Sequence, residues 1–356
     1  MKKWPKFIMV LSMILLAVFF AAGVLIRVYA PRVIEKQIRQ NLKVRASLGR
    51  ISLNFPFTIV LEKLEIGDLA NIKRISFSPD LIALAFGKVV IHGLTINEPV
   101  INLEQGPDGK LNLPFSSTAQ GSSAKAPEIY PLGLKVRDAK IIFTDRKINT
   151  EGYQLIIDKL NINISKVSFP VTSLATNFNL SCRMMNPEGV VFGNVLFSGR
   201  LDYPAGDMDA KLEVKDMDIT NFSAYYGNFI SHKKLLSAML NLDSTFKARD
   251  NALKISTDFN LSGLEYEQGE NAAALDLAKD ALDLFTDSQG NLHLTFDIDT
   301  RLDNPGLSAE KLKNAILKAA MKNLVSQSPE QLANKVSNMI DKFKDYKKEL
   351  KDIFGR

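Results

Sequence analysis

Residues 292–298, Leu-His-Leu-Thr-Phe-Asp-Ile, alternate apolar and polar side chains without a break. Successive side chains of a β-strand point to opposite faces of a sheet, so this segment predicts a strand with one apolar and one polar face. The same period of two recurs along much of the chain. Asp297 and Asp299 fall opposite Phe296, which indicates a solvated outer face rather than a catalytic carboxylate pair. The sequence therefore predicts a mainly β protein.

Apolar residues in several of these segments share one phase of the alternation, and we call them the apolar set. Cys182 has the phase of its neighbours in this set, so we expect this single cysteine to be a small buried apolar residue. The apolar set consists of Leu160, Ile162, Ile164, Phe178, Leu180, Met184, Leu253, Ile255, Phe259, Leu261, Leu292, Leu294, Phe296 and Ile298.

Two arrangements would use these amphipathic strands. In the first, two sheets bury their apolar faces against each other as a sandwich or a barrel. In the second, one long curved sheet leaves its apolar face along an open groove. A large bare apolar surface is not tolerated in water, so an open groove implies an apolar ligand or partner. The alternation alone leaves both arrangements open.

Residues 7–26, FIMVLSMILLAVFFAAGVLI, form an uncharged run. A helix rises about 1.5 Å per residue, so the run would cover roughly 30 Å, the thickness of the hydrocarbon core of a bilayer. It is longer than the apolar region of a cleaved signal peptide, so we expect an uncleaved membrane anchor. The count of flanking Lys and Arg would leave the long side in the cytoplasm, but long domains translocate largely regardless of charge. We expect a single-pass inner-membrane protein with its bulk in the periplasm.

The remaining chain divides by composition. Residues 272–285 and 221–240 have helical patterns within the β region, and Ser328 with Pro329 is a strong helix start. The helix expected over residues 329–354 has one apolar stripe. This stripe could pack on its own domain, lie on a membrane surface or pair with another helix. The expected domains are an anchor with a short cytoplasmic tail (1–30), an N-terminal β unit (31–115), a Ser-rich linker or loop (116–127), a longer β unit (128–306) and C-terminal amphipathic helices (307–356).

Composition and motifs argue against several functions. The net charge is +6, but no basic patch with interleaved aromatic residues indicates a nucleic-acid partner. The single cysteine excludes an intrachain disulfide. The three histidines stand in unrelated contexts, and no nucleophile elbow, phosphate-binding loop or dinucleotide motif is present. We therefore expect no enzyme, and no catalytic residue, metal or cofactor.

Two groups of segments together resemble the AsmA-like family of bacterial envelope proteins, the AsmA- and TamB-related group. In the N-terminal part the similarity rests on the anchor, the basic segment after it and residues 91–114, IHGLTINEPVINLEQGPDGKLNLP. In the C-terminal part it rests on residues 217–227 (MDITNFSAYYG), 236–268 and 287–308. The resemblance covers most of residues 1–320, and it concerns patterns of fold rather than catalytic signatures.

The resemblance implies the open arrangement: a long curved antiparallel β-sheet groove with a few covering helices. The apolar set would line this groove and hold the acyl chains of membrane phospholipids moving between the inner and outer membranes. About a dozen strands at roughly 4.8 Å would give a groove of roughly 60 Å, too short to span a periplasm alone. The helix over residues 329–354 could bind an envelope partner. A lipid-free assembly factor for outer-membrane proteins remains the alternative function.

Overall fold

The computed structural model describes residues 31–113 and 130–167 with short gaps, then residues 174–226, 235–266, 286, 291–306 and five positions between 311 and 319. The expected anchor, the Ser-rich segment 116–127 and the expected helices over residues 272–285 and 329–354 lie outside the described residues. Within the described part, none of the helices combines the length and hydropathy that a membrane crossing requires.

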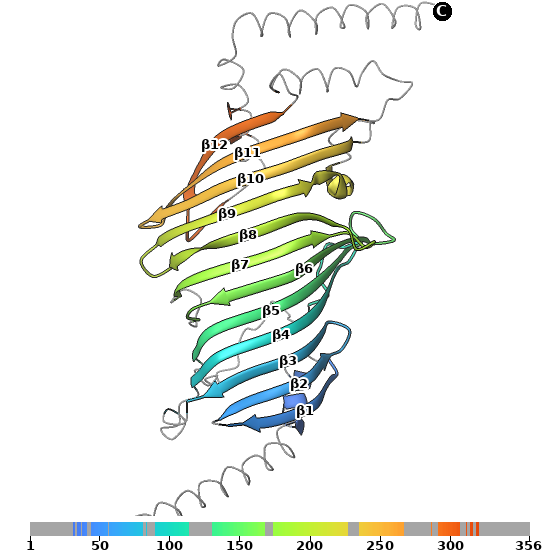
Figure 1. Cartoon of the computed structure of the whole chain (residues 1–356), viewed down its shortest axis with the longest axis vertical. Coiled ribbons are helices and arrows are strands. Elements are labelled where there is room, and N and C mark those ends of the chain that lie inside the picture. Colours follow the sequence, from blue (N-terminus) through green and yellow to red (C-terminus); the bar gives the residue numbers. More distant parts are fainter. Residues whose placement is uncertain are drawn as a thin grey trace, which may run out of the picture. The chain divides into compact units, whose positions relative to one another are not determined.

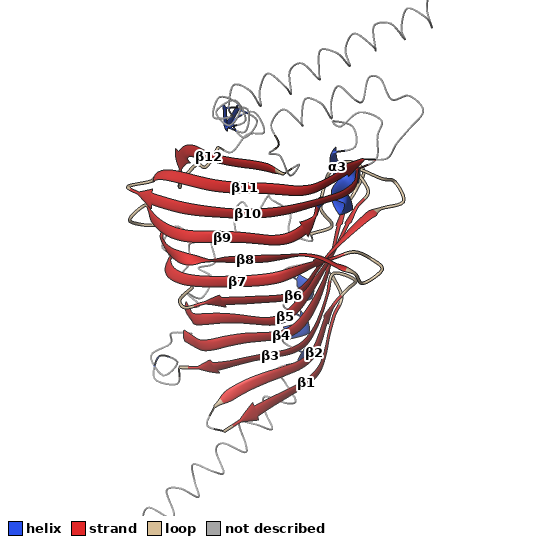
Figure 2. Cartoon of the chain, turned by 45° about the horizontal axis from the view of Figure 1, so that its top comes forward, coloured by secondary structure: helices blue, strands red, loops and turns tan. Residues whose placement is uncertain are grey.

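The described chain is mainly β, as predicted, and its strands belong to one sheet. The strands follow one another in the sheet in the order of the sequence, from β1 to β12 (Figures 1 and 2). The first and last strands do not pair with each other, so the described strands form neither a closed barrel nor two separate facing sheets. Few helical residues accompany them.

Two compact units divide the chain, residues 1–176 and residues 177–356. The strands are β1 (Ala46–Asn54), β2 (Thr58–Ile66), β3 (Ala70–Pro79), β4 (Val90–Gln105), β5 (Tyr130–Asp145), β6 (Tyr153–Ile164), β7 (Ala175–Met185), β8 (Val191–Asp202), β9 (Asp207–Asp218), β10 (Leu235–Arg249), β11 (Ala252–Tyr266) and β12 (Leu292–Arg301). The division falls inside β7.

One pair of strands departs from the antiparallel sheet expected from the sequence. β4 and β5 are parallel, and their register runs from Val90 opposite Tyr130 to Gln105 opposite Asp145. A parallel pair requires a crossover of a dozen or more residues, and residues 106–129 supply one. The crossover begins with a turn from Gly106 to Gly109, closed by a hydrogen bond of 2.8 Å from the Gly109 N–H to the Gly106 carbonyl.

β4 runs without a break through Glu98-Pro99, and its register with β3 and β5 does not change there. Glu98 has φ 47°, and Asp138 on β5 has φ 51°. At Asp138 the pairing of β5 with β6 shifts by one residue, which is a bulge. A bulge adds one residue to a strand, so the side chains on either side of it return to the same face. Asn161 on β6 supports the bulge at Asp138, because its Oδ1 accepts a hydrogen bond from the Asp138 N–H at 3.2 Å. Apolar positions thereby stay on one face despite the extra residue.

A buried apolar cluster of the first unit lies at its edge strand. Leu48, Ile51, Leu61 and Leu64 form a buried cluster on β1 and β2. The helical residues Ile34 and Ile38 pack against this cluster. The carboxylate of the intervening Glu35 accepts a hydrogen bond of 3.0 Å from the Leu48 N–H. Unpaired N–H groups of an edge strand invite pairing with other chains, so this contact shields part of the edge.

The helix expected over residues 221–240 is wrong from Leu235 onward, because Leu235 begins β10. Only residues 219–226 are helical among the described residues of this stretch, as a 3₁₀ turn followed by one α-helical turn, α3 (Ser223–Tyr226). Asp218 caps them, since its carboxylate accepts a hydrogen bond of 3.0 Å from the Thr220 N–H. From Leu235 onward, cross-strand pairing overrides the helical propensity of Ala and Leu.

The core of the second unit lies on β10 to β12. Leu294 and Phe296 are buried there, together with Ala319, and Ala315 packs against the same cluster. Residues 315 and 319 are one helical turn apart, so a small-residue helix face covers this end of the sheet.

Replacing Leu294 with Ala should destabilise the protein by about 2–5 kcal/mol, because the removed side chain leaves a cavity in a well-packed core. The neighbouring Thr295 is exposed on the opposite face. Thr295→Ala should change the free energy of unfolding by less than about 0.5 kcal/mol. Urea denaturation followed by circular dichroism measures both variants. Equal losses would contradict the assignment of the two faces.

Candidate functional site

The second unit has one apolar and one charged face, and the strand register shows how they arise. One row of directly paired residues runs across β8 to β12: Gly199, Ala210, Phe246, Ile255 and Ile298. The next row, one residue along each strand, consists of Arg200, Asp209, Lys247, Lys254 and Asp299. Side chains of adjacent rows point to opposite faces of the sheet. We call the face of the first row the apolar face.

The structure brings the β11 and β12 members of the apolar set together on the apolar face. Leu253, Ile255, Phe259 and Leu261 alternate along β11, and Leu292, Leu294, Phe296 and Ile298 alternate along β12. For example, Phe259 pairs directly with Leu294, and Leu261 pairs with Leu292. The role of these residues as a lipid lining stays a prediction.

The other members lie on β6 and β7. In the first unit, Leu160 pairs with Ala139, Ile162 with Val136 and Ile164 with Leu134, so these residues face the apolar side chains of β5. Phe178, Leu180 and Met184 alternate along β7 and are half-buried.

An aromatic row crosses the apolar face. The ring of Phe178 lies 4.9 Å from that of Phe197, and the ring of Phe197 lies 5.6 Å from that of Phe246 in an edge-on contact. Gly199 and Ala210, which lie in the row of Phe246, approach each other closely: a Cβ added to Gly199 would lie only 2.4 Å from the Cβ of Ala210. Edge-on and tilted rings at these separations attract each other by about 0.5–1.5 kcal/mol.

Phe197 and Phe246 are functional candidates that the apolar set omits. The signal for Phe197 was available, since Val195, Phe197 and Leu201 alternate along β8. The signal for Phe246 was the alternation of β10, and the helix expected up to Leu240 obscured the start of this strand.

Exposure varies across the apolar face. Leu292, Leu294 and Phe296 are buried, near Ala315 and Ala319. In contrast, the apolar side chains on β8 to β10 in and around the aromatic row are only half-buried. These are Val195, Phe197, Leu212, Val214, Leu242 and Phe246. We call these six residues the uncovered patch.

One polar pair interrupts the apolar face. The hydroxyl groups of Ser244 and Thr257, which are cross-strand neighbours, are hydrogen-bonded at 2.9 Å, and both residues are buried. Each hydroxyl thereby has a partner inside an apolar surrounding, which removes most of the cost of burying it.

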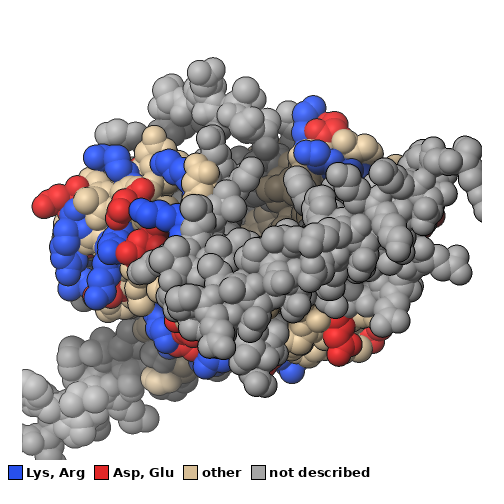
Figure 3. All heavy atoms as spheres, turned by 90° about the horizontal axis from the view of Figure 1, so that it is seen from above, with Lys and Arg blue, Asp and Glu red and all other residues tan. Residues whose placement is uncertain are grey.

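The opposite face carries several ion pairs. Lys211 contacts Glu213 at 2.6 Å and Asp243 at 3.0 Å, and Lys254 contacts Asp297 at 2.9 Å. The hydrogen bond to Glu213 raises the pKa of Lys211, and the one from Lys211 lowers the pKa of Glu213. Lys and Arg side chains are interleaved with Asp and Glu side chains on the surface drawn in Figure 3. Exposed pairs of this kind add little stability, so their main effect is to keep this face in water.

Two histidines of the described part of the chain lie beside carboxylates. His92 contacts Asp80 at 3.0 Å, and His293 contacts Asp258 at 3.5 Å. Among the described residues no group of three or more His, Cys, Asp and Glu side chains could hold a metal ion.

Comparisons with known proteins add no identification. No protein-family model matches the chain, and the search of curated proteins gives no match. The site therefore has to be interpreted from its own geometry.

Cys182 offers a native probe of the apolar phase of β7. Burial raises the pKa of its thiol, so at pH 8 a smaller fraction is thiolate than in an ordinary cysteine. We expect alkylation by iodoacetamide at pH 8 to be several-fold slower than at an exposed cysteine, with the difference narrowing as the pH rises. The control combines Cys182→Ser with Thr295→Cys. Equal rates for the two proteins at pH 8 would contradict the burial of Cys182.

Proposed function

We propose that this protein binds phospholipid through the apolar face and takes part in phospholipid transport between the inner and outer membranes. The observation that carries the proposal is the uncovered patch, a set of apolar side chains on adjacent strands that no described segment buries fully. Water disfavours such a surface at roughly 25 cal/mol per Å² of apolar area, so an apolar ligand would be stabilised on it.

The chemistry of the patch fits an acyl chain. Its side chains are aliphatic or aromatic, and the buried hydroxyls of Ser244 and Thr257 are already satisfied by each other. A hydrocarbon chain needs no hydrogen-bond partners and can follow a row of side chains along or across the strands. The charged face on the other side of the same strands would remain in water.

The proposed setting is the periplasm of a bacterial envelope. In it, the apolar run of residues 7–26 anchors the chain in the inner membrane, and the strands curve into an AsmA-like groove. The similarity of residues 91–114 and 217–227 to that family supports this setting, as does the open order of the sheet. The helix over residues 329–354 is proposed to contact an envelope partner.

Neighbouring residues of β8 provide a direct test of lipid contact. A photo-crosslinking amino acid at Phe197, in the uncovered patch, should capture phospholipid in cells. The same amino acid at Leu196, which is exposed on the opposite face, should capture none. Mass spectrometry of the crosslinked chain reads out both positions.

Two outcomes would count against lipid binding. If position 197 captures only protein, the alternative of a lipid-free assembly factor for outer-membrane proteins gains support. If positions 196 and 197 capture lipid equally, contact with lipid does not depend on the apolar face.

A charge in the uncovered patch should displace the ligand. Leu242 is half-buried between Val214 and Phe259, and a carboxylate there cannot be satisfied against a hydrocarbon chain. We expect Leu242→Glu to lower the phospholipid extracted per purified chain several-fold while the thermal midpoint changes little. Thr245→Glu, on the exposed face beside Lys211, should leave the lipid content unchanged. Unchanged lipid content in Leu242→Glu would argue against the patch as the binding surface.

A further inference from the structure

The polar face of the first unit carries an open hollow of about 690 Å³ across β2 to β5. It lies opposite the apolar side chains of the same strands: Leu61, Ile75, Ile96 and Val136 form one cross-strand row. The row one residue along, Glu62, Arg74, Asn97 and Arg137, belongs to the hollow.

Positive charge exceeds negative charge in this hollow. Its cationic residues are Lys63, Lys73, Arg74 and Arg137, and its carboxylates are Glu62 and Glu98. Glu98 is already engaged, since both of its oxygens lie 2.7 Å from the Lys73 Nζ. By contrast, the side chains of Arg74 and Arg137 make no ion pair or hydrogen bond within the part of the chain that the structure describes. Both are exposed, so their guanidinium groups are available to a ligand.

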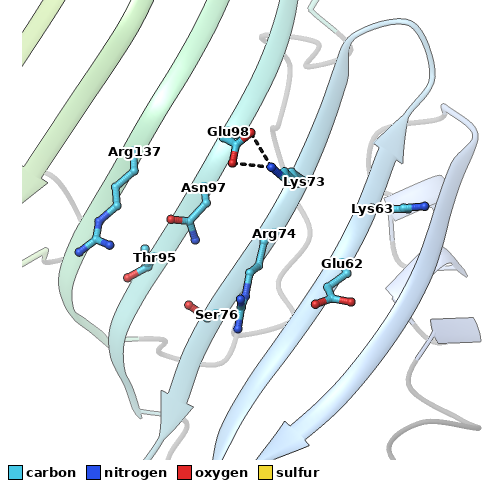
Figure 4. A pocket seen from close by; sticks show the side chains of 9 residues that line it. All are labelled: Glu62, Lys63, Lys73, Arg74, Ser76, Thr95, Asn97, Glu98 and Arg137. Carbon is cyan, nitrogen blue, oxygen red and sulfur yellow. Dashed lines mark hydrogen bonds and ion pairs between the residues drawn. The ribbon is translucent and has the colours of Figure 1, made fainter.

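The register places these two arginines on either side of one amide. Arg74 pairs with Asn97 across β3 and β4, and Asn97 pairs with Arg137 across the parallel strands β4 and β5. Figure 4 shows the two arginine side chains pointing the same way along the strands and flanking Thr95. Ser76 pairs with Thr95 on β3 and β4, which adds two hydroxyl groups to the same hollow.

We propose that this hollow binds a phosphoryl group. A guanidinium donates two parallel hydrogen bonds to a phosphate, and two such forks from β3 and β5 could hold one anion between them. The Asn97 amide and the hydroxyls of Ser76 and Thr95 are donors for its remaining oxygens. Donors from three strands exceed what the two oxygens of a carboxylate can use. The phosphoryl group could belong to a lipid headgroup or to a free phosphate compound.

The site is independent of the proposed lipid contact on the apolar face. It uses the polar side of β2 to β5 in the first unit, whereas the uncovered patch belongs to β8 to β10 in the second. Loss of phosphoryl binding would therefore leave the acyl-chain proposal untouched, and the reverse also holds.

Isothermal titration of the full chain in a nonionic detergent tests the proposal. The probes are inorganic phosphate and glycerophosphoglycerol, the headgroup of a phosphatidylglycerol without its acyl chains. We expect saturable binding of at least one probe, at least tenfold weaker in the double variant Arg74→Gln/Arg137→Gln. The control Arg200→Gln/Lys247→Gln removes the same charge from the polar face of the second unit and should bind as the parent does.

The preferred probe identifies the source of the phosphoryl group. If glycerophosphoglycerol binds more tightly and this binding is weakened in the double variant, the ligand is a lipid headgroup. Tighter binding of inorganic phosphate supports a free phosphate compound. Absence of saturable binding for both probes overturns the proposal, as does an equal loss in the control.

A second variant separates geometry from charge. Arg74→Lys/Arg137→Lys keeps both charges but removes the forked donors, so it should bind several-fold more weakly than the parent chain. Since it changes neither the charge nor the exposed position, it also serves if the glutamine variant fails to fold. Binding equal to that of the parent would overturn recognition by the guanidinium forks.

Discussion

The register of the backbone hydrogen bonds is the constraint on which the rest of this molecule depends. Each strand has an apolar and a polar phase, and a slip of one residue would move every side chain to the opposite face. Bulges change the phase locally, and the second unit repeats the solution of the first: Asp216 has φ 50°, and its N–H donates to Asn241 Oδ1 at 3.0 Å. At the bulges of Asp138 and Asp216, an asparagine on the neighbouring strand thus accepts the hydrogen bond of the aspartate N–H group.

Both surfaces with proposed functions are products of this register. In the second unit, the row of Phe246 and the row of Lys247 differ by one residue and meet opposite surroundings. In the first unit, the same displacement separates the buried Leu61 from the polar hollow that contains Arg74. When the apolar face of a sheet is only partly covered, the same strands present both an apolar surface and a charged surface.

Alternation in the sequence was sufficient to predict the mainly β class and the apolar phase of β11 and β12, because period two is a local property. It was insufficient wherever distant residues decide the outcome. The dipeptide Glu98-Pro99 predicted a strand break, since Glu-Pro is a common breaker and the continuing pairing is visible only in β3 and β5. Arg74 and Arg137 become near neighbours only through the parallel pairing of β4 with β5, which no local pattern announces.

That parallel pair also has a consequence for how the chain folds. The hairpin between β1 and β2 brings Asn54 to Thr58, four residues along the chain, whereas β4 and β5 pair residues that lie 40 apart, such as Val90 and Tyr130. Loop-closure entropy rises with the logarithm of loop length, so the second closure costs about 2 kcal/mol more. Hairpins on either side form through local turns, whereas pairing of β4 with β5 requires residues far apart in the sequence to meet. We therefore expect the pairing of β4 with β5 to limit the rate at which the first unit folds.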